Sequence, residues 1–261
     1  MKIGFIAIVG TASLVASADA GFLGFVALAK QSGANVLVDI YTGVGNASDK
    51  FLNVYNTTAS TTAAGGFFQQ AGLATKTWKP DAANFNSTRS SVDSFMTAGT
   101  YSGAAYNGEY YASTNTNGDP NFTGTSWNAT PASAAATTIP ANAGWYTGDP
   151  TSVDNKAILL SSLSAGYTRF DSVATTASGN TQGSTGSANA TYGIWCSHLV
   201  IAGTLNSLYG GAISWIASAS IKDGVTGATD QRISNLGDHT PTPGAIALLA
   251  VAGFSSRRRR H

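Results

Sequence analysis

Residues Asn35–Tyr41, which read Asn-Val-Leu-Val-Asp-Ile-Tyr, decide the fold class. Successive side chains of a β-strand point to opposite faces of its sheet. One face of this segment therefore carries the β-branched residues Val36, Val38 and Ile40. The other face carries Leu37, Asp39 and Tyr41. This alternation of period two predicts a β-strand with two different faces.

Further segments rich in β-branched and aromatic residues are bounded by Gly, Asn, Asp and Pro, which is typical of short strands. They are Phe51–Tyr55, Gly66–Gln70, Thr191–Thr204 and Gly211–Ile221, with a turn at 209–211 joining the last two. Residues 104–111 predict a hairpin, because Asn107-Gly108 readily adopts the two positive φ angles of a type I′ turn. Ala157–Leu163 is a strand or a short helix.

Two segments made mainly of Ser, Thr, Asn, Gly and Ala predict long loops, at 113–143 and 174–190. Many short strands without alternating helices indicate an all-β fold, an antiparallel β-sandwich or jelly-roll-like single domain. We expect an N-terminal signal helix and a C-terminal hydrophobic sorting helix to flank it. The roughly 220 residues between these ends suffice for one substantial core.

The first twenty residues have the three parts of a secretory signal peptide. Lys2 supplies the positive charge, residues 3–15 are apolar or small, and Ala18-Asp19-Ala20 fits the small-x-small pattern at a cleavage site. We therefore expect signal peptidase to recognise Ala18 and Ala20 and to cleave the chain before Gly21.

An uncleaved membrane anchor is the alternative interpretation, because residues 21–29 are apolar as well. Asp19 disfavours this alternative, since an aspartate at the centre of a membrane helix costs about 2.5–3.5 kcal/mol. The sequence therefore favours cleavage.

The C-terminal segment has a second three-part pattern. Pro241 and Pro243 precede an apolar run at residues 244–254, and the chain then ends in a basic cluster. The four cations of this cluster are Arg257, Arg258, Arg259 and Arg260. The pattern resembles the sorting signal of PEP-CTERM proteins, which are exported by bacteria that make exopolysaccharide. Thr242 makes it a Pro-x-Pro variant of that signal.

The resemblance covers about the last twenty residues and divides the chain into three parts. They are a signal peptide at 1–20, a β-sandwich domain at 21–238 and a PEP-CTERM-like sorting tail at 239–261. The resemblance implies that the hydrophobic helix inserts transiently into the membrane. It also implies that a membrane-embedded, exosortase-like enzyme cleaves near the prolines.

Residues 21–240 hold nine Lys and Arg against twelve Asp and Glu, which leaves a net charge of −3. The basic residues are scattered, so this part lacks the basic patch of a nucleic-acid-binding protein. Charged residues make up 10% of the chain, against roughly 25% in average soluble domains. Ser, Thr, Asn, Gly and Ala take their place, which suits a polar but uncharged extracellular surface.

The sequence offers little for catalysis. The only glutamate, Glu109, flanks a predicted turn, whereas sugar hydrolysis needs two carboxylates roughly 5–10 Å apart. His198 lacks an accompanying Gly-x-Ser-x-Gly nucleophile motif. Cys196, the single cysteine, lies two residues away and would share a strand face with His198. Zinc needs three or four ligands, so we expect a buried cysteine and a hydrogen-bonded histidine. We assign no catalytic residue, metal ligand or cofactor. A structural calcium bound by loop oxygens of Asn115, Asn117, Asp119 and Asp149 stays open as an alternative.

Aromatic residues crowd into residues 101–146 among Asn, Thr, Ser and Gly. Rings can fill a sandwich core, and exposed rings beside amides and hydroxyls can bind sugar faces. The candidate glycan-binding residues are Tyr110, Trp127, Trp145 and Tyr146.

Together these patterns predict a non-enzymatic, exported cell-surface or exopolysaccharide-matrix protein. Its expected partners are signal peptidase, an exosortase-like processing enzyme and exopolysaccharide. The alternative is a carbohydrate-binding or adhesive β-sandwich module that uses residues 101–146.

Overall fold

The computed structural model describes residues 21–68, 78, 93–99, 105–106, 109–110, 114–115, 135–136, 138–147, 157–162, 166–171, 173–176, 185–186 and 190–236. Over these residues the chain is an all-β domain, and all its strand pairs are antiparallel. The predicted all-β fold class is therefore confirmed, whereas the expected N-terminal signal helix and C-terminal sorting helix lie outside the described residues.

The first sheet has eight strands. They are β1 (Phe22–Ser32), β2 (Asn35–Val44), β4 (Phe67–Phe68), β5 (Phe95–Met96), β9 (Ala135–Ala136), β11 (Ile158–Leu159), β12 (Thr168–Asp171) and β15 (Tyr192–Ala202). Their order is β12-β1-β2-β15-β4-β9, and both β5 and β11 also pair with β15. The central strands β1, β2 and β15 are thus contributed by both ends of the described chain.

The second sheet has seven strands. They are β3 (Lys50–Thr61), β8 (Thr114–Asn115), β10 (Ala143–Thr147), β13 (Val173–Thr176), β14 (Thr185–Gly186), β16 (Ile213–Lys222) and β17 (Thr229–Asn235). Their order is β14-β13-β17-β16-β3-β10-β8. A separate hairpin pairs β6 (Ala105–Tyr106) with β7 (Glu109–Tyr110), as the Asn-Gly turn predicts.

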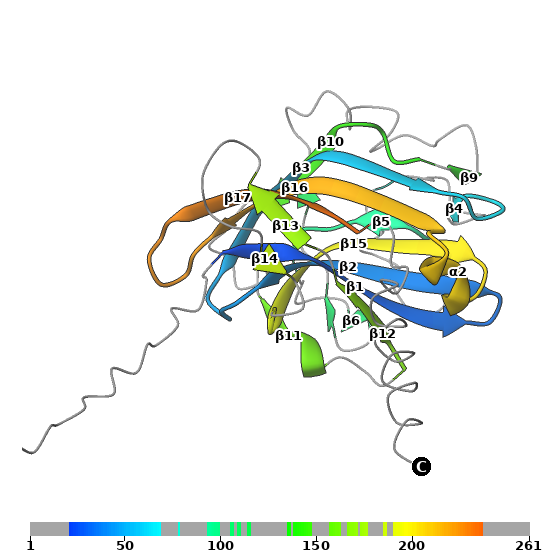
Figure 1. The fold of residues 1–261 in the computed structure, drawn as a ribbon, viewed down its shortest axis with the longest axis horizontal. Helices are drawn as coiled ribbons and strands as arrows, with labels where there is room; N and C mark the ends of the chain where they lie inside the picture. Colours follow the sequence, from blue (N-terminus) through cyan, green and yellow to red (C-terminus); the bar gives the residue numbers. More distant parts are fainter. Residues whose placement is uncertain are drawn as a thin grey trace, which may run out of the picture.

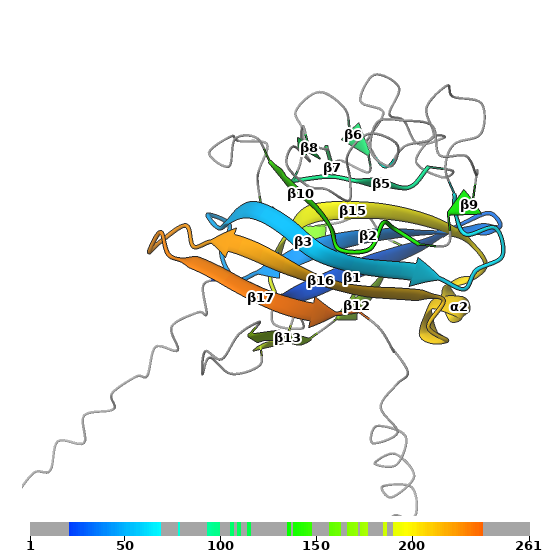
Figure 2. The same cartoon turned by 90° about the horizontal axis from the view of Figure 1, so that it is seen from above.

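The long strands of the two sheets lie in two layers, with β1, β2 and β15 in one and β3, β16 and β17 in the other (Figures 1 and 2). One continuous apolar core combines buried side chains from both layers. Phe25 of β1 meets Trp215 of β16 edge to face, with ring centroids 5.7 Å apart. Burial of these two inner faces is the main stabilising contribution to a sandwich without a disulfide.

The alternation predicted at residues 35–41 is confirmed in β2. Val36, Val38 and Ile40 join the core between the sheets. Leu37 and Tyr41 join a second apolar cluster on the outer face of the first sheet. That sheet is therefore buried on both faces.

The strand β1 is absent from the sequence prediction, which treats residues 21–29 only as a possible membrane anchor. Eight consecutive residues from Phe22 to Ala29 are buried. A strand covered on both faces reads as a continuous apolar run rather than an alternation. Such a run gives no signal of period two.

Two other expectations need correction. The connection between β15 and β16 is longer than the predicted turn at 209–211, because the two strands lie in different sheets. The short helix α2 (Leu205–Tyr209) carries the chain from one layer to the other at one end of the sandwich (Figure 1). The predicted loop at 174–190 contains paired strand residues, since β13 and β14 form a ladder.

Residues 157–163 combine both predicted alternatives. The strand β11 is followed directly by a 3-10 turn, η2 (Leu160–Ser162).

None of the helices within the described residues has the length and apolar character needed to cross a bilayer.

Candidate functional site

The structure corrects the prediction that Trp145 binds glycans. Its side chain is 1% exposed and lies in the core between the sheets. The indole Nε1 donates hydrogen bonds to the carbonyl oxygens of Thr97 at 2.8 Å and Cys196 at 3.1 Å. Because the ring is enclosed and its polar atom is bonded to protein, it offers no face to a sugar.

The other glycan candidates have different placements. Tyr146, next to Trp145 on β10, is half-buried and pairs in register with Asn53 of β3 and Asn115 of β8. Tyr110 belongs to β7, and its side chain lies outside the described part of the structure. Trp127 also lies outside the described residues.

Cys196 and His198 do not share a face of β15, contrary to the sequence prediction. The register between β15 and β2 shifts between Trp195 and Ser197, which marks a β-bulge at Cys196. An extra residue in a strand reverses the alternation of the side chains beyond it. Cys196 consequently faces the core between the sheets, whereas His198 faces the outer apolar layer.

The Cys196 thiol is a buried structural group. Its Sγ donates a hydrogen bond to the carbonyl oxygen of Ile40 at 3.2 Å. Burial raises the pKa of this thiol well above its ordinary value. The side chain therefore stays protonated at neutral pH and is a poor nucleophile.

His198 instead forms a buried pair with Asp39, which joins β15 to β2. Its Nδ1 lies 2.5 Å from Oδ1 of Asp39, and the two side chains are 0% and 3% exposed. The Tyr167 hydroxyl donates to Asp39 Oδ2 at 3.3 Å. Phe95 stacks on the imidazole with centroids 5.1 Å apart, and Trp195 packs edge-on at 6.2 Å.

The His198–Asp39 geometry matches the acid–base half of a hydrolytic triad. Aromatic rings surround the imidazole, however, and a substrate in solvent does not reach it in this structure. The pair instead satisfies two polar groups inside an apolar layer, which costs less than leaving either unpaired. Sequence alone gave no signal for it, because the partners are 159 residues apart.

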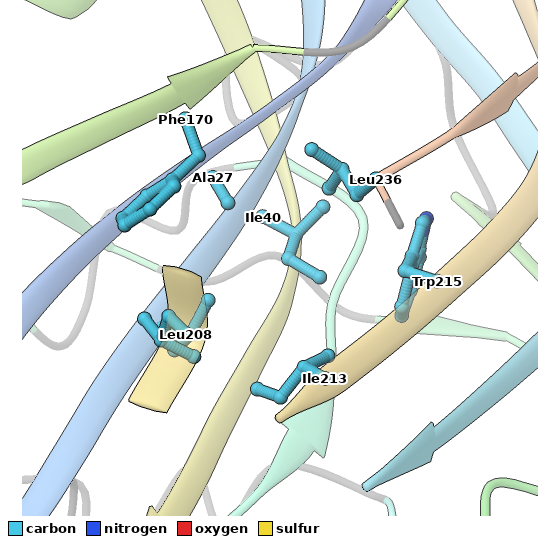
Figure 3. A pocket seen from close by; sticks show the side chains of 8 residues that line it. Ala27, Ile40, Phe170, Leu208, Ile213, Trp215 and Leu236 are labelled. Atoms are coloured by element: carbon cyan, nitrogen blue, oxygen red, sulfur yellow. The ribbon is translucent and has the colours of Figure 1, made fainter. Parts of the chain in front are cut away.

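A small apolar pocket with a cavity volume of about 20 Å³ lies near α2 (Figure 3). Its walls come from β1, β2, β12, α2, β16 and the residue after β17. They include Ala27, Ile40, Phe170, Leu208, Trp215 and Leu236. Within the described part of the chain, the Nε1 of Trp215 is buried and has no hydrogen-bond partner. The walls of the pocket are apolar, so it is a small unfilled space between the two sheets.

The space beside Ala27 leads to a testable prediction. We expect Ala27→Val to raise the free energy of unfolding by about 0.5–1 kcal/mol, because the added methyl groups fill empty apolar space. Ala29 lies on the same strand as Ala27 and also faces the core, but it does not line the pocket. Ala29→Val should instead lower stability by about 1–3 kcal/mol through overpacking. Urea unfolding measures the free energy of unfolding of both variants. Equal destabilisation by the two substitutions would show that the pocket does not accommodate the valine side chain at position 27.

Asp49, Asp223 and Asp230 lie in the part of the fold where β1 begins, although the three carboxylates do not converge on one point. The Phe22 backbone N–H donates to Asp230 Oδ2 at 3.0 Å. The Gly224 backbone N–H donates to Asp49 Oδ1 at 3.1 Å. Burial raises the pKa of Asp49, and the nearby Asp223 carboxylate raises it further. Sequence reasoning missed this site because its residues come from three separate turns or strands.

The sorting and processing residues predicted from sequence lie outside the described part of the chain. They are Ala18, Ala20, Pro241, Pro243, Arg257, Arg258, Arg259 and Arg260. Among the residues that are described, no three His, Cys, Asp or Glu side chains converge as a metal site.

No protein-family model, curated protein or solved structure matches this chain significantly. The class that the structure defines is an antiparallel all-β domain of two packed sheets.

Proposed function

We propose that this chain is an exported, non-enzymatic protein of a bacterial cell surface or exopolysaccharide matrix. Signal peptidase removes residues 1–20, and an exosortase-like enzyme acts on the tail at 239–261. The domain between them is the part that remains at the surface, with exopolysaccharide as its surroundings.

The observation that carries this proposal is the position of the fold between the two sequence signals. The first strand begins at Phe22, one residue after the expected mature terminus. The last strand ends at Asn235, six residues before Pro241. Both signals therefore flank the sandwich, so their removal would leave its strands and core intact.

The composition of the chain supports an extracellular setting. Its 10% content of charged residues is low, and polar uncharged residues replace them. Its stability comes from two apolar layers rather than from cross-links. The carbohydrate-binding alternative loses one of its anchors with the burial of Trp145, and no other described residue favours it.

Intact mass spectrometry of the protein recovered outside cells of its native host tests the proposal. We expect an amino terminus at Gly21 and a carboxyl terminus near Pro241, without the four arginines. A chain that reaches the surface with Arg257–Arg260 still attached would exclude exosortase-like processing. A mature terminus upstream of Ala18 would exclude the expected signal-peptidase site.

Deletion of residues 239–261 serves as the matched control for sorting. The truncated chain keeps the signal peptide and the whole described sandwich, so it should be exported but not retained at its normal location. Fractionation followed by immunoblotting distinguishes export from retention. Unchanged retention would contradict the role of the tail.

A further inference from the structure

The strand β3 contains a bulge near its middle. In the ladder with β16, residues 56 and 57 lie opposite Ala217 alone. In the ladder with β10, residues 55 and 56 lie opposite Gly144 alone. Asn56 is therefore the residue that is extra in both ladders. Bulges often re-aim a side chain beside a functional site.

The backbone of Asn56 is left-handed, with a φ of +51°. A bulge that needs this conformation ordinarily has glycine at the position, because glycine has no Cβ to strain. Asparagine is among the few other residues that adopt it readily. The backbone alone therefore does not explain why the position holds a carboxamide. That side chain is exposed, although Val54 and Ala59 of the same strand lie in the core.

Asn56 begins the triplet Asn56-Thr57-Thr58, which has the Asn-x-Thr pattern of an acceptor for N-linked glycosylation. This modification depends on the amide of the first residue and the hydroxyl of the third. Thr58 is exposed like Asn56, whereas the middle residue, Thr57, is 0% exposed. The strand thus presents both required residues to solvent and buries the one whose identity the pattern leaves free.

The other such triplet among the described residues, Asn46-Ala47-Ser48, is less available. Asn46 is half-buried and its backbone N–H donates to Asp49 Oδ2 at 3.2 Å. Its carbonyl oxygen accepts the Asp49 backbone N–H at 3.3 Å. Gly224 packs against the backbone of Ser48, where a Cβ would overlap. This triplet is therefore closed into a turn, and Asn56 is the more accessible acceptor of the two.

We propose that Asn56 is a glycosylation site whose amide nitrogen carries an oligosaccharide. The donor is an oligosaccharide linked to a lipid pyrophosphate. Asn56 Nδ2 forms a bond to the anomeric carbon of the first sugar as the bond between that carbon and the pyrophosphate oxygen breaks. The lipid pyrophosphate leaves with the electron pair, and the amide gives one proton to a base of the transferase. The inference rests on the proposed export, because N-linked acceptors belong to secreted chains.

The fold also sets when the transfer takes place. The strand β3 is hydrogen-bonded to β16 on one side and to β10 on the other, so residues 56–58 are held in the completed sheet. The oligosaccharide is therefore added to the exported chain before β3 is paired. The exposed position of Asn56 then lets the sandwich close with the sugar outside its core. A glycan hydrates the surface that carries it, in a chain with only 10% charged residues.

Peptide mass spectrometry of the mature protein from its native host tests the assignment. Trypsin cuts after Lys30, Lys50 and Lys76. Asn46 is then in peptide 31–50 and Asn56 in peptide 51–76. We expect peptide 51–76 to carry the added mass of one or more sugars and peptide 31–50 to be unmodified. An unmodified peptide 51–76 would overturn the proposal, whether or not peptide 31–50 carries sugar.

Three variants in the native host distinguish an N-linked glycan from sugar on the Ser and Thr residues of the same peptide. Thr58→Ala removes the acceptor hydroxyl but leaves Asn56 in place, so the added mass should be lost. Thr58→Ser keeps a hydroxyl and should keep the added mass. Asn56→Gly suits the positive φ, so it should lose the added mass and still fold. Added mass that persists in Thr58→Ala or Asn56→Gly would contradict an N-linked glycan.

Asn46→Gln is the matched control, because it removes the amide of the closed triplet and should leave the mass of peptide 51–76 unchanged. The amino terminus is read in the same sample. A chain that retains residues 1–20 has not been processed, which contradicts the proposed function and the glycosylation that rests on it. A chain that begins at Gly21 with an unmodified Asn56 has been exported without a glycan, which contradicts only this inference. The two failures are thus distinguishable.

Discussion

Replacing Asp39 with alanine is expected to lower the free energy of unfolding by about 3–5 kcal/mol. The variant removes the partner of a fully buried histidine, so His198 Nδ1 would remain in an apolar layer without its carboxylate. The same change leaves the Tyr167 hydroxyl without its acceptor on Asp39. The lost histidine pair links β2 to β15 at the centre of the first sheet. The lost tyrosine hydrogen bond links β2 to the residue before β12.

Urea unfolding followed by tryptophan fluorescence measures this effect. Asp171→Ala is the matched control, because its ion pair with Arg169 is at the surface, with both side chains 32% exposed. That variant should change stability by less than about 1 kcal/mol. Similar small effects for both variants would mean that the buried pair contributes no more than a surface one.

The part of the fold that sequence reasoning predicted depended on local alternation. The strand at residues 35–41 was predicted together with the face of each side chain. Its side chains alternate, and only one of its two faces carries a charged residue, Asp39. The hairpin of β6 and β7 was predicted from a two-residue turn. In each case the information lies within a few consecutive residues.

Elements whose identity depends on distant contacts were not predicted. The strand β1 is covered on both faces by segments far away in the chain, so its apolar run resembles a membrane segment. The bulge at Cys196 is fixed by the register with β2, and it reverses the face of every residue after it. The sequence-based placement of His198 on the face of Cys196 failed for this reason.

The candidate sites also fall into those that a linear sequence pattern predicts and those that only the folded structure reveals. The signal peptide and tail are linear patterns and could be described without a structure. The pairing of Asp39 with His198 and the hydrogen bond from Gly224 to Asp49 require the strands to be assembled. Aromatic composition, by itself, did not separate core rings from exposed rings, and Trp145 belongs to the core.

Trp145→Ala is expected to destabilise the domain by about 3–5 kcal/mol, an effect comparable with that of Asp39→Ala. The substitution empties a large space beside Trp215, whose ring centroid lies 6.1 Å away. It also removes the indole donor shared by the carbonyls of Thr97 and Cys196. Trp145→Phe, which keeps most of the volume but not the donor, should fall between the wild type and the alanine variant.

Tyr146→Ala is the control for Trp145→Ala, because Tyr146 is adjacent on β10 but only half-buried. We expect it to cost about 1 kcal/mol, near the centre of the range for single substitutions. Measuring urea unfolding and retention on exopolysaccharide side by side distinguishes a core role from a binding role for Trp145. If Trp145 is a core residue, its loss lowers the unfolding midpoint, and any loss of retention follows the unfolded fraction. A Trp145→Ala protein with wild-type stability but without polysaccharide retention would contradict the burial of this ring and restore its role in glycan binding.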